Sequence, residues 1–289
     1  MSTDDFGVVD PLVSVDWLAD HLENPGVRVF DCTVLLSPDP NGSGTLAENG
    51  RSTYEMGHIP TSGFLDLLSD FADPDSPFRF TLPSADRFAR KIGELGVNDT
   101  RTVVLYDRRG TMWAARAWMM FRAFSFRGQV AVLDGGQKAW TASGRALSTD
   151  SPTYAPASCS AELRPGIFTD KQDVLDGGAC VVNALSAQQH RGEAGSAYYG
   201  RPGRIAGSAN VPYDSLIDPA TGRLRSTDEL RTAFAAVIDD RRVITYCGGG
   251  IAASLDAFAL HLLGRDDVSV YDASLMEWST DPSLPMEVG

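Results

Sequence analysis

Cys247 is the residue of this chain whose surroundings point most directly to chemistry. It follows the apolar run from Arg242 to Tyr246. It opens a loop of small residues that consists of Gly248, Gly249, Gly250, Ile251, Ala252 and Ala253. We expect a strand, a tight loop and the start of a helix here, in that order. Free N–H groups and the helix dipole would then favour a negative charge on the sulfur, as a thiolate or a persulfide.

The other three cysteines lack such a setting. Cys32 and Cys180 lie in or beside apolar, strand-like runs, and Cys159 lies in a polar segment. The chain has no Cys-x-x-Cys pair and no histidine at metal-ligand spacing, so neither a zinc site nor a disulfide framework nor a cofactor is expected. For Cys247 too, the alternative is a buried structural role, which is common for free cysteines. Its glycine-rich loop favours catalysis over that alternative.

An anionic substrate would need a positive charge near this loop. The segment from His190 to Arg204 offers Arg191, Arg201 and Arg204 against one acid, Glu193. It is a locally basic segment in an acidic chain, and we expect these arginines to bind the substrate. The alternative for each of them is a solvated charge on a loop.

The composition of the chain excludes several classes of partner. It has 289 residues and a formal net charge of -13, which would repel nucleic-acid backbones and anionic lipid surfaces. No apolar stretch approaches the roughly 20 residues of a membrane span, and residues 1–5 lack the basic and apolar regions of a signal peptide. We therefore expect a globular protein of the cytoplasm that binds neither nucleic acid nor membranes.

The two halves of the chain carry related motifs in the same order. The matching pairs include Val29-Phe30-Asp31 with Val181-Val182-Asn183, Gly57-His58-Ile59-Pro60 with Gly203-Arg204-Ile205-Ala206, and Val130-Ala131-Val132-Leu133-Asp134 with Val268-Ser269-Val270-Tyr271-Asp272. Tyr106-Asp107 falls on Tyr246-Cys247, so Asp107 stands where the second half has its cysteine. This repeat predicts two domains of one fold.

Within each half, short runs of Val, Ile and Leu alternate with amphipathic helical stretches. This alternation is typical of α/β domains in which helices cover a mainly parallel sheet. The segment from Ser148 to Ala161 is rich in Ser, Pro, Thr and Ala and has no periodic apolar pattern. We therefore predict a first domain over 1–150, a linker over 151–161 and a second domain over 162–289. In such sheets ligands gather at the carboxyl ends of the strands, where we expect Cys247.

These motifs resemble the tandem rhodanese-type sulfurtransferases, the thiosulfate and 3-mercaptopyruvate sulfurtransferase family. The similarity covers nearly the whole chain and rests on the Gly57-His58-Ile59-Pro60 turn, the Asp134-Gly135-Gly136 stretch followed by Trp140, the loop after Cys247, and the closing stretch from Val270 to Trp278. It implies two rhodanese-like domains and sulfur transfer through a persulfide of Cys247. Because a carboxylate such as Asp107 cannot carry a transferable sulfur, only the second domain can be catalytic.

The resemblance also implies the partners of the reaction. A small anionic donor would supply the sulfur, and cyanide or a thiol would accept it, either as a small molecule or on a protein such as thioredoxin. Relatives specific for thiosulfate carry cations directly after the cysteine, whereas Gly248 and Gly249 are neutral. We therefore favour 3-mercaptopyruvate slightly over thiosulfate as the donor.

The resemblance assigns further roles to residues outside the loop. Arginines of the second-half segment bind the anionic end of the donor in relatives, which implies Arg191 above all and also Arg201. The turn that holds His58 faces the catalytic loop in relatives, so His58 would orient the loop or relay protons. The alternative is that His58 only stabilises its turn. A serine that works with this histidine in mercaptopyruvate-type relatives is replaced by Gly249. Arg204 occupies the position of His58 in the repeat and would face Asp107.

Two other functions are alternatives to sulfur transfer. A cysteine phosphatase needs an arginine six positions after the cysteine to clamp phosphoryl oxygens, and residue 253 is alanine, so we exclude it. A non-enzymatic sulfur carrier or a regulatory binding module on the same fold stays open, because a fold does not determine a function. Catalytic turnover would separate the enzyme from the carrier.

Overall fold

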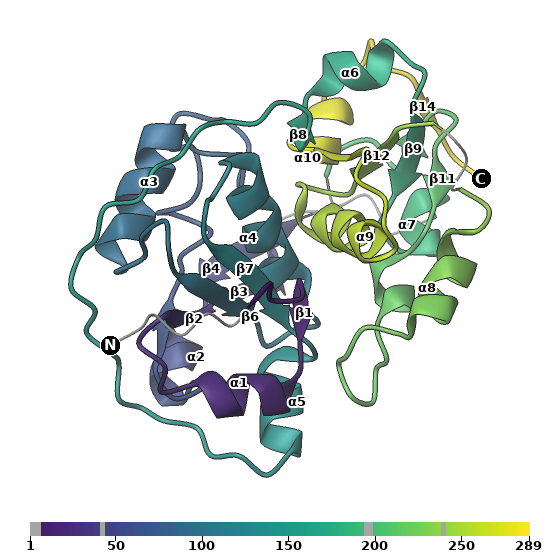
Figure 1. The fold of residues 1–289 in the computed structure, drawn as a ribbon. Coiled ribbons are helices and arrows are strands. Elements are labelled where there is room, and N and C mark those ends of the chain that lie inside the picture. Colours follow the sequence, from purple (N-terminus) through teal and green to yellow (C-terminus); the bar gives the residue numbers. More distant parts are fainter. Residues whose placement is uncertain (1–6, 41–43, 194–198, 238–240) are drawn as a thin grey trace.

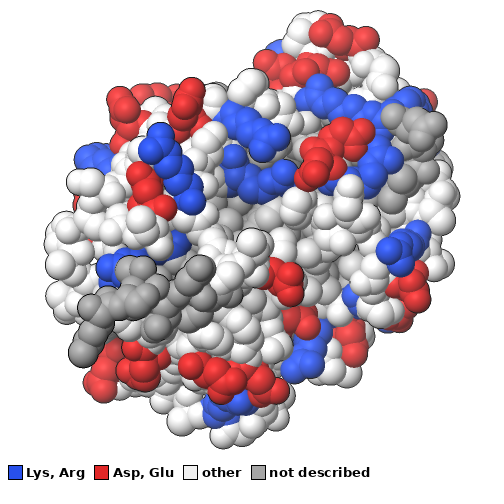
Figure 2. All heavy atoms as spheres, in the orientation of Figure 1, with Lys and Arg blue, Asp and Glu red and all other residues white. Residues whose placement is uncertain are grey.

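The computed structural model describes residues 7–40, 44–193, 199–237 and 241–289, which form two domains that lie side by side (Figure 1). On the face shown in Figure 2, acidic and basic side chains lie in mixed groups. No helix among the described residues is both long and apolar enough to span a membrane.

The first domain is built on a five-stranded parallel sheet with the strand order β1-β7-β6-β2-β5. Its elements are β1 (Leu12–Val13), α1 (Val15–His21), β2 (Val27–Asp31), β3 (Val34–Pro38), β4 (Thr45–Asn49), α2 (Arg51–Met56), β5 (Ser62–Phe64), α3 (Ala85–Glu94), β6 (Thr102–Tyr106), α4 (Met112–Ala123), β7 (Gln129–Leu133) and α5 (Gly136–Ala142). Strands β3 and β4 form a separate antiparallel pair.

The second domain repeats this sheet with the order β11-β9-β12-β13-β8, again all parallel. Its elements are β8 (Phe168–Thr169), α6 (Lys171–Leu175), β9 (Cys180–Asn183), α7 (Ala187–His190), β10 (Arg204–Ile205), β11 (Ala209–Asn210), the 3-10 helix η1 (Tyr213–Leu216), α8 (Thr227–Phe234), β12 (Val243–Tyr246), α9 (Ile251–Leu262), β13 (Val268–Tyr271), α10 (Ser274–Trp278) and β14 (Met286–Glu287). The predicted fold class, two α/β domains with parallel sheets, is confirmed.

The repeat extends to individual hydrogen bonds. In the first domain, the Tyr106 hydroxyl receives the N–H of Ile59 at 3.2 Å and lies 2.9 Å from the Ser62 hydroxyl. In the second domain, the Tyr246 hydroxyl makes the same pair of contacts, at 3.0 Å to the N–H of Ile205 and 2.7 Å to the Ser208 hydroxyl. The last residue of the central strand therefore anchors the equivalent turn in both domains.

Local sequence signals explain where several helices begin and end. Ser226 and Glu229 form a complete capping box at the start of α8, which ends at Phe234. Helix α9 begins at Ile251, and its N-cap residue, Gly250, adopts the left-handed conformation that glycine permits. Residues 251 and 252 therefore lie in the first turn of the helix, where backbone N–H groups have no acceptor within the helix.

The domain interface is built mainly by α4 and α9, which lie against each other (Figure 1). Trp118 of α4 and Phe258 of α9 meet edge to face, with 4.8 Å between their ring centroids. Most residues of both helices are buried on every side, as expected for helices that are covered by a sheet on one face and a second domain on the other. This packing places the loop before α9 next to the first domain.

The segment that connects the domains stays attached to the first one. Residues 151–164 contain no helix or strand and run along its outer face (Figure 1). Backbone hydrogen bonds join Ala157 to Gly93 and Arg164 to Ala123. The predicted linker over 151–161 is therefore extended and irregular, but it packs on a domain.

Candidate active site

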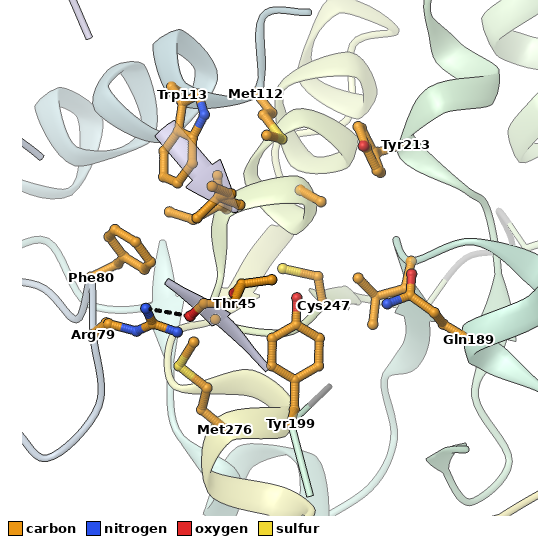
Figure 3. A pocket seen from close by; sticks show the side chains of 15 residues that line it. Thr45, Arg79, Phe80, Met112, Trp113, Gln189, Tyr199, Tyr213, Cys247 and Met276 are labelled. Carbon is orange, nitrogen blue, oxygen red and sulfur yellow. Dashed lines mark hydrogen bonds between the residues drawn. The ribbon is translucent and has the colours of Figure 1, made fainter. Parts of the chain in front are cut away.

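Cys247 lies directly after β12, at the carboxyl end of the central strand, and its residue is 3% exposed. It lines a cavity of about 220 Å³ between the two domains (Figure 3). The first domain contributes mainly Leu36, Thr45, Arg79, Phe80, Met112 and Trp113, and the second contributes Leu185, Gln189, Tyr199, Tyr213, Ile251 and Met276 besides the loop of Cys247. The thiol is thus shielded from bulk water and still open to a small ligand.

The loop is held in place by the segment that follows β13. The Ser274 hydroxyl accepts the N–H groups of Cys247 at 3.1 Å and Gly250 at 3.2 Å, and it donates to the carbonyl of Tyr271 at 2.7 Å. The N–H of Met276 binds the carbonyl of Gly248 at 2.9 Å. Both ends of the loop are therefore anchored, and a reacting sulfur needs no backbone rearrangement to keep its position. Sequence reasoning did not identify Ser274 as part of the site.

Several N–H groups of this loop remain available. Within the described part of the chain, the N–H groups of Gly248, Gly249 and residues 251–253 have no hydrogen-bond acceptor. Three of them are the first N–H groups of α9, which have no acceptor within the helix and lie at the positive end of its dipole. Such an arrangement binds an anion, for example a thiolate or the outer sulfur of a persulfide.

The first domain contains the same arrangement with an anion already in it. The Asp107 carboxylate accepts the N–H groups of Arg109 at 2.7 Å, Thr111 at 3.1 Å, Trp113 at 2.9 Å and Ala114 at 3.0 Å. Trp113 and Ala114 are the second and third residues of α4, so their counterparts at the start of α9 are residues 252 and 253. Burial raises the pKa of Asp107, and the backbone bonds act against this shift.

Two of the other three cysteines, Cys32 and Cys159, have surroundings that suppress reactivity. Burial raises the pKa of Cys32 well above its ordinary value, with Asp31 acting in the same direction. Burial and the neighbouring Asp99 raise the pKa of Cys159 to about 12. Neither of these cysteines lines the cavity. At neutral pH both carry a proton, and a protonated thiol is a poor nucleophile.

A neutral phenol stands near Cys247. Tyr213 lines the same cavity, and burial raises its pKa, with Asp214 and the Cys247 sulfur acting in the same direction. The hydroxyl of Tyr213 therefore keeps its proton at neutral pH and can donate a hydrogen bond to an anion in the cavity. The ring of Tyr199 lies directly against Gly248, so closely that a Cβ atom at residue 248 would overlap it.

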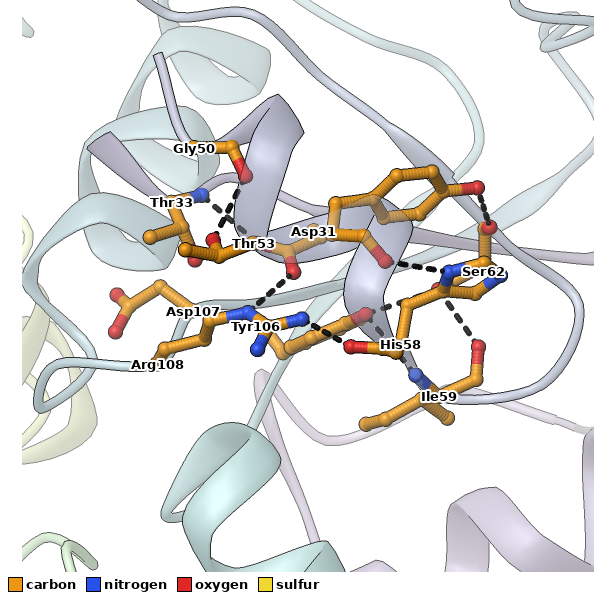
Figure 4. Close-up of polar contacts among 12 residues, drawn as sticks. Asp31, Thr33, Gly50, Thr53, His58, Ile59, Ser62, Tyr106, Asp107 and Arg108 are labelled. Atoms are coloured by element: carbon orange, nitrogen blue, oxygen red, sulfur yellow. Dashed lines mark hydrogen bonds and ion pairs between the residues drawn. The ribbon is translucent and has the colours of Figure 1, made fainter. Parts of the chain in front are cut away.

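The structure does not bring His58 to Cys247. His58 is fully buried and lies beside Ile59 in the first domain (Figure 4). It stacks on Tyr54 with 4.0 Å between ring centroids, and its two ring nitrogens lie 2.9 Å from the Tyr54 carbonyl and 3.2 Å from the Asp150 carbonyl. It precedes β5 and therefore lies at the amino ends of the strands, whereas Cys247 follows a carboxyl end. These contacts stabilise the turn of His58 and join it to the end of the first domain. His58 is therefore not in a position to relay a proton to Cys247.

Arg108 likewise has a structural position in the first-domain loop. Its Nε lies 3.2 Å from the carboxylate of the buried Asp31, and its Nη2 donates to the carbonyl of Gly57 (Figure 4). The loop of the first domain is thus fixed internally and carries no exposed nucleophile.

None of the three predicted substrate-binding arginines lines the cavity. Arg191 is half exposed and pairs with Glu193 at 2.6 Å. Arg204 pairs with Glu287 at 3.3 Å and donates to the Gly289 carbonyl at 2.7 Å, so it does not face Asp107.

Arg201 has a different and more complete set of contacts. Its guanidinium donates to the carbonyls of Trp278, Ser279, Asp281 and Leu284. These groups include the carbonyls left unpaired at the end of α10, which Arg201 satisfies. The guanidinium of Arg201 therefore holds the C-terminal segment in place and does not face the cavity.

Arg79 is a cavity residue that sequence reasoning missed. It lies on the irregular segment between β5 and α3 of the first domain, and it is the one Lys or Arg among the described residues that line the cavity. The stretch Pro77-Phe78-Arg79-Phe80 does show a charge between aromatic residues. Nothing in the sequence indicated that this segment of the first half lies opposite the cysteine of the second half.

Comparisons with known proteins agree with this architecture. The family model described as "Rhodanese-like domain" matches residues 14–143 and 187–281. A 3-mercaptopyruvate sulfurtransferase of Escherichia coli is 32% identical over 282 residues, which cover 95% of this chain and 97% of that protein. A sulfur carrier protein of Thermus thermophilus, TtuD, is 31% identical over 300 residues, which cover 96% of each chain.

A solved structure extends the agreement to the coordinates. The crystal structure of SseA from Escherichia coli, presented as a 3-mercaptopyruvate sulfotransferase with the rhodanese fold, matches with a TM-score of 0.79 and 29% sequence identity, and covers 92% of this chain and 99% of that chain. The family that the sequence motifs predicted is confirmed. The chain belongs to the rhodanese-like family, as a two-domain enzyme of the thiosulfate and 3-mercaptopyruvate sulfurtransferase group.

Proposed function

We propose that this sulfurtransferase takes sulfur from a small anionic donor, holds it as a persulfide on Cys247 and passes it to cyanide or a thiol. The observation that carries the proposal is the group of available N–H donors around Cys247, whose counterpart in the first domain already binds the Asp107 carboxylate. Acceptors of the proposed reaction include small thiols and a protein such as thioredoxin. We also propose that the reaction takes place in the cytoplasm.

The reaction would have two steps, the formation of the Cys247 persulfide and its discharge to the acceptor. With 3-mercaptopyruvate, the Cys247 thiolate attacks the donor's sulfur, the carbon–sulfur bond breaks, and the leaving enolate of pyruvate takes up the proton of the donor's thiol. In the second step, cyanide attacks the outer sulfur of the persulfide, thiocyanate leaves, and the thiolate returns. The N–H groups of the loop would stabilise the negative sulfur between the steps.

We favour 3-mercaptopyruvate over thiosulfate as the donor. Thiosulfate is a compact dianion, and the two residues after Cys247 are glycines without charge. The rest of the cavity wall is largely apolar or aromatic, as in Leu36, Phe80 and Trp113. A donor with one carboxylate and a carbon skeleton suits such a wall better than an ion with two charges close together.

Intact-protein mass spectrometry after incubation with each donor tests the proposal. The wild type should gain the mass of one sulfur, which cyanide should remove over many cycles, and Cys247→Ser should gain none. Cys159→Ser is the matched control, because the raised pKa of Cys159, about 12, keeps that thiol protonated, and this variant should behave as the wild type. A sulfur gain that persists in Cys247→Ser would contradict the proposal.

The sulfur-carrier alternative deserves the same experiment, because one relative is named a sulfur carrier protein. A carrier would be loaded on Cys247 but would discharge only to a specific partner, without turnover to cyanide or small thiols. Multiple turnovers with a small acceptor would support the enzyme, and a single stable loading would support the carrier.

A further inference from the structure

The cavity around Cys247 presents one positive charge to a ligand. Among the described residues that line it, Arg79 is the one Lys or Arg, and no Asp or Glu lines it. Arg79 and Cys247 belong to different domains and lie on the wall of the same space (Figure 3). The wall near Arg79 consists of apolar side chains such as Phe80 and Met276. A ligand that contacts both residues therefore needs an anionic group, a short apolar body and a reactive sulfur.

The guanidinium of Arg79 retains donors for such a ligand. Its Nη1 donates to the carbonyl of Thr45 at 3.0 Å, and its Cζ lies 5.9 Å from the centroid of the Phe80 ring. Among the described residues, no carboxylate pairs with Arg79, and its Nε and Nη2 have no acceptor. The hydrogen bond to Thr45 thus orients the side chain, and the remaining N–H groups of the planar guanidinium stay available to bind a carboxylate.

The segment that carries Arg79 is attached to helix α4 of its own domain and to the second domain. The carbonyl of Phe80 accepts from Arg116, and the N–H of Leu82 donates to the Asp272 carboxylate at 2.8 Å. Asp272 precedes the residues that hold the Cys247 loop. The position of Arg79 relative to Cys247 is therefore determined by fixed contacts, which reduces the conformational entropy that a ligand must overcome.

We propose that Arg79, a residue of the non-catalytic domain, binds the anionic group of the sulfur donor and selects thiols that carry a single carboxylate on a short carbon chain. The inference rests on the proposed function for the identity of the ligand as a sulfur donor. It assigns to the first domain a direct role in substrate recognition. The arginines predicted from the sequence, Arg191, Arg201 and Arg204, have contacts with Glu193, Glu287 and backbone carbonyls, and they are not among the residues that line the cavity.

Alkylation of Cys247 by iodoacetate and by iodoacetamide tests this assignment without any sulfur donor. The two reagents form the same carbon–sulfur bond with loss of iodide and differ in charge, so the ratio of their rates at Cys247 measures the anion affinity of the cavity. Arg79→Gln should lower the iodoacetate-to-iodoacetamide ratio about tenfold, as expected for the loss of a charge-assisted hydrogen bond. Arg79→Lys should lower it less, and Arg231→Gln, on exposed α8, should leave it unchanged.

Arg191→Gln separates this proposal from the assignment based on the sequence. An unchanged ratio in Arg191→Gln together with a lowered ratio in Arg79→Gln supports Arg79. An unchanged ratio in Arg79→Gln, or equal losses in both variants, overturns the assignment. Thermal unfolding of each variant verifies that the fold is intact.

Steady-state kinetics then test the donor class. Arg79→Gln should raise KM for 3-mercaptopyruvate about tenfold and leave the final loading of Cys247 at saturating donor unchanged. A KM equal to that of the wild type would overturn the proposal. If the wild type itself takes up no sulfur, the proposed function fails, and the alkylation ratios still decide whether Arg79 binds anions.

Discussion

Arg116 of the first domain and Asp272 of the second form an ion pair across the domain interface, with 2.6 Å between Nη2 and Oδ1. Arg116 is 1% exposed and also lies 4.4 Å from the centroid of the Phe168 ring. The pair also contacts the segment that carries Arg79 and the loop of Cys247. Asp272 accepts the N–H of Leu82 at 2.8 Å, and the Arg116 side chain lies against Gly250. The catalytic loop is therefore positioned in part by a cation from the domain that lacks a nucleophile.

Breaking this pair should reduce both stability and activity. Arg116→Met leaves the Asp272 carboxylate without its cation, and removal of one partner of a buried pair typically costs about 3–5 kcal/mol. We expect urea unfolding to show a loss of this order and kcat/KM to fall at least tenfold, about 1.4 kcal/mol, because the loop loses its support.

The exposed pair of Arg231 and Asp228 on α8, at 3.0 Å, provides the matched control. Arg231→Met should change the free energy of unfolding very little, because water screens exposed pairs. Equal effects of Arg116→Met and Arg231→Met would show that the interdomain pair has no special role.

The three loop glycines should differ in their tolerance of a methyl group. At Gly249, a Cβ would meet the flexible end of Met276 at 3.1 Å, and Gly249→Ala should keep kcat/KM within about threefold of the wild type. Gly250 has a φ of 75°, and its Cβ would lie 2.7 Å from the Asp272 carbonyl and 2.9 Å from the Arg116 guanidinium. Gly250→Ala should therefore lower kcat/KM at least tenfold, and so should Gly248→Ala through its overlap with Tyr199.

Gly144→Ala separates backbone strain from steric overlap. Gly144 has a φ of 81° with no atom within 4 Å of a built Cβ. Its substitution should cost about 1–2 kcal/mol of stability from the left-handed conformation and leave kcat/KM unchanged. A uniform effect across the three loop glycines would contradict the proposed tight fit of the loop.

Asp256 should make the stability of the protein fall as the pH rises. It is fully buried in α9, and neither carboxylate oxygen has a hydrogen-bond partner among the described residues. Burial raises the pKa of Asp256 well above its ordinary value, so folding favours the protonated form. Its contribution to stability is complete below the pKa of the unfolded chain, about 3.9, and is lost as the pH rises through the folded-state pKa.

Asp256→Asn tests this expectation by thermal unfolding between about pH 4 and pH 9. The variant cannot ionise, so its Tm should exceed that of the wild type by about 2 °C or more at neutral and alkaline pH, and the advantage should shrink in acid. Asp228→Asn, at an exposed carboxylate, should follow the wild-type profile. Parallel profiles for Asp256→Asn and the wild type would refute a role for this carboxyl.

Asp107→Asn should separate the structural loop of the first domain from the catalytic loop of the second. An asparagine offers one acceptor oxygen, and its NH₂ group would face N–H donors that now bind the carboxylate, for example that of Trp113 at 2.9 Å. We expect a loss of about 1–3 kcal/mol in the free energy of unfolding. Sulfur loading of Cys247, measured by mass spectrometry, should remain complete in the folded variant. Cys247→Ser should show the opposite behaviour, with stability kept and loading lost.

The sequence by itself determined the features that depend on neighbours along the chain. The apolar strand, the glycines and the helix that surround Cys247 are adjacent in sequence, so local backbone preferences predicted their arrangement. The internal repeat paired Asp107 with Cys247, and the structure shows both at the ends of central strands. The two-domain α/β fold followed from the same repeat and from the alternation of apolar runs with helical stretches.

Only the tertiary structure decided which charges reach the cavity. Arg201 carries the same charge as Arg79, but its guanidinium binds the carbonyls at the end of α10, and His58 is enclosed by Tyr54 and the backbone of Asp150. Arg79 reaches the cavity because α4 and α9 pack against each other and bring one segment of the first domain to the cavity that Cys247 lines. These relations depend on contacts between residues that are far apart in sequence, and neither spacing nor composition specifies how two domains pack.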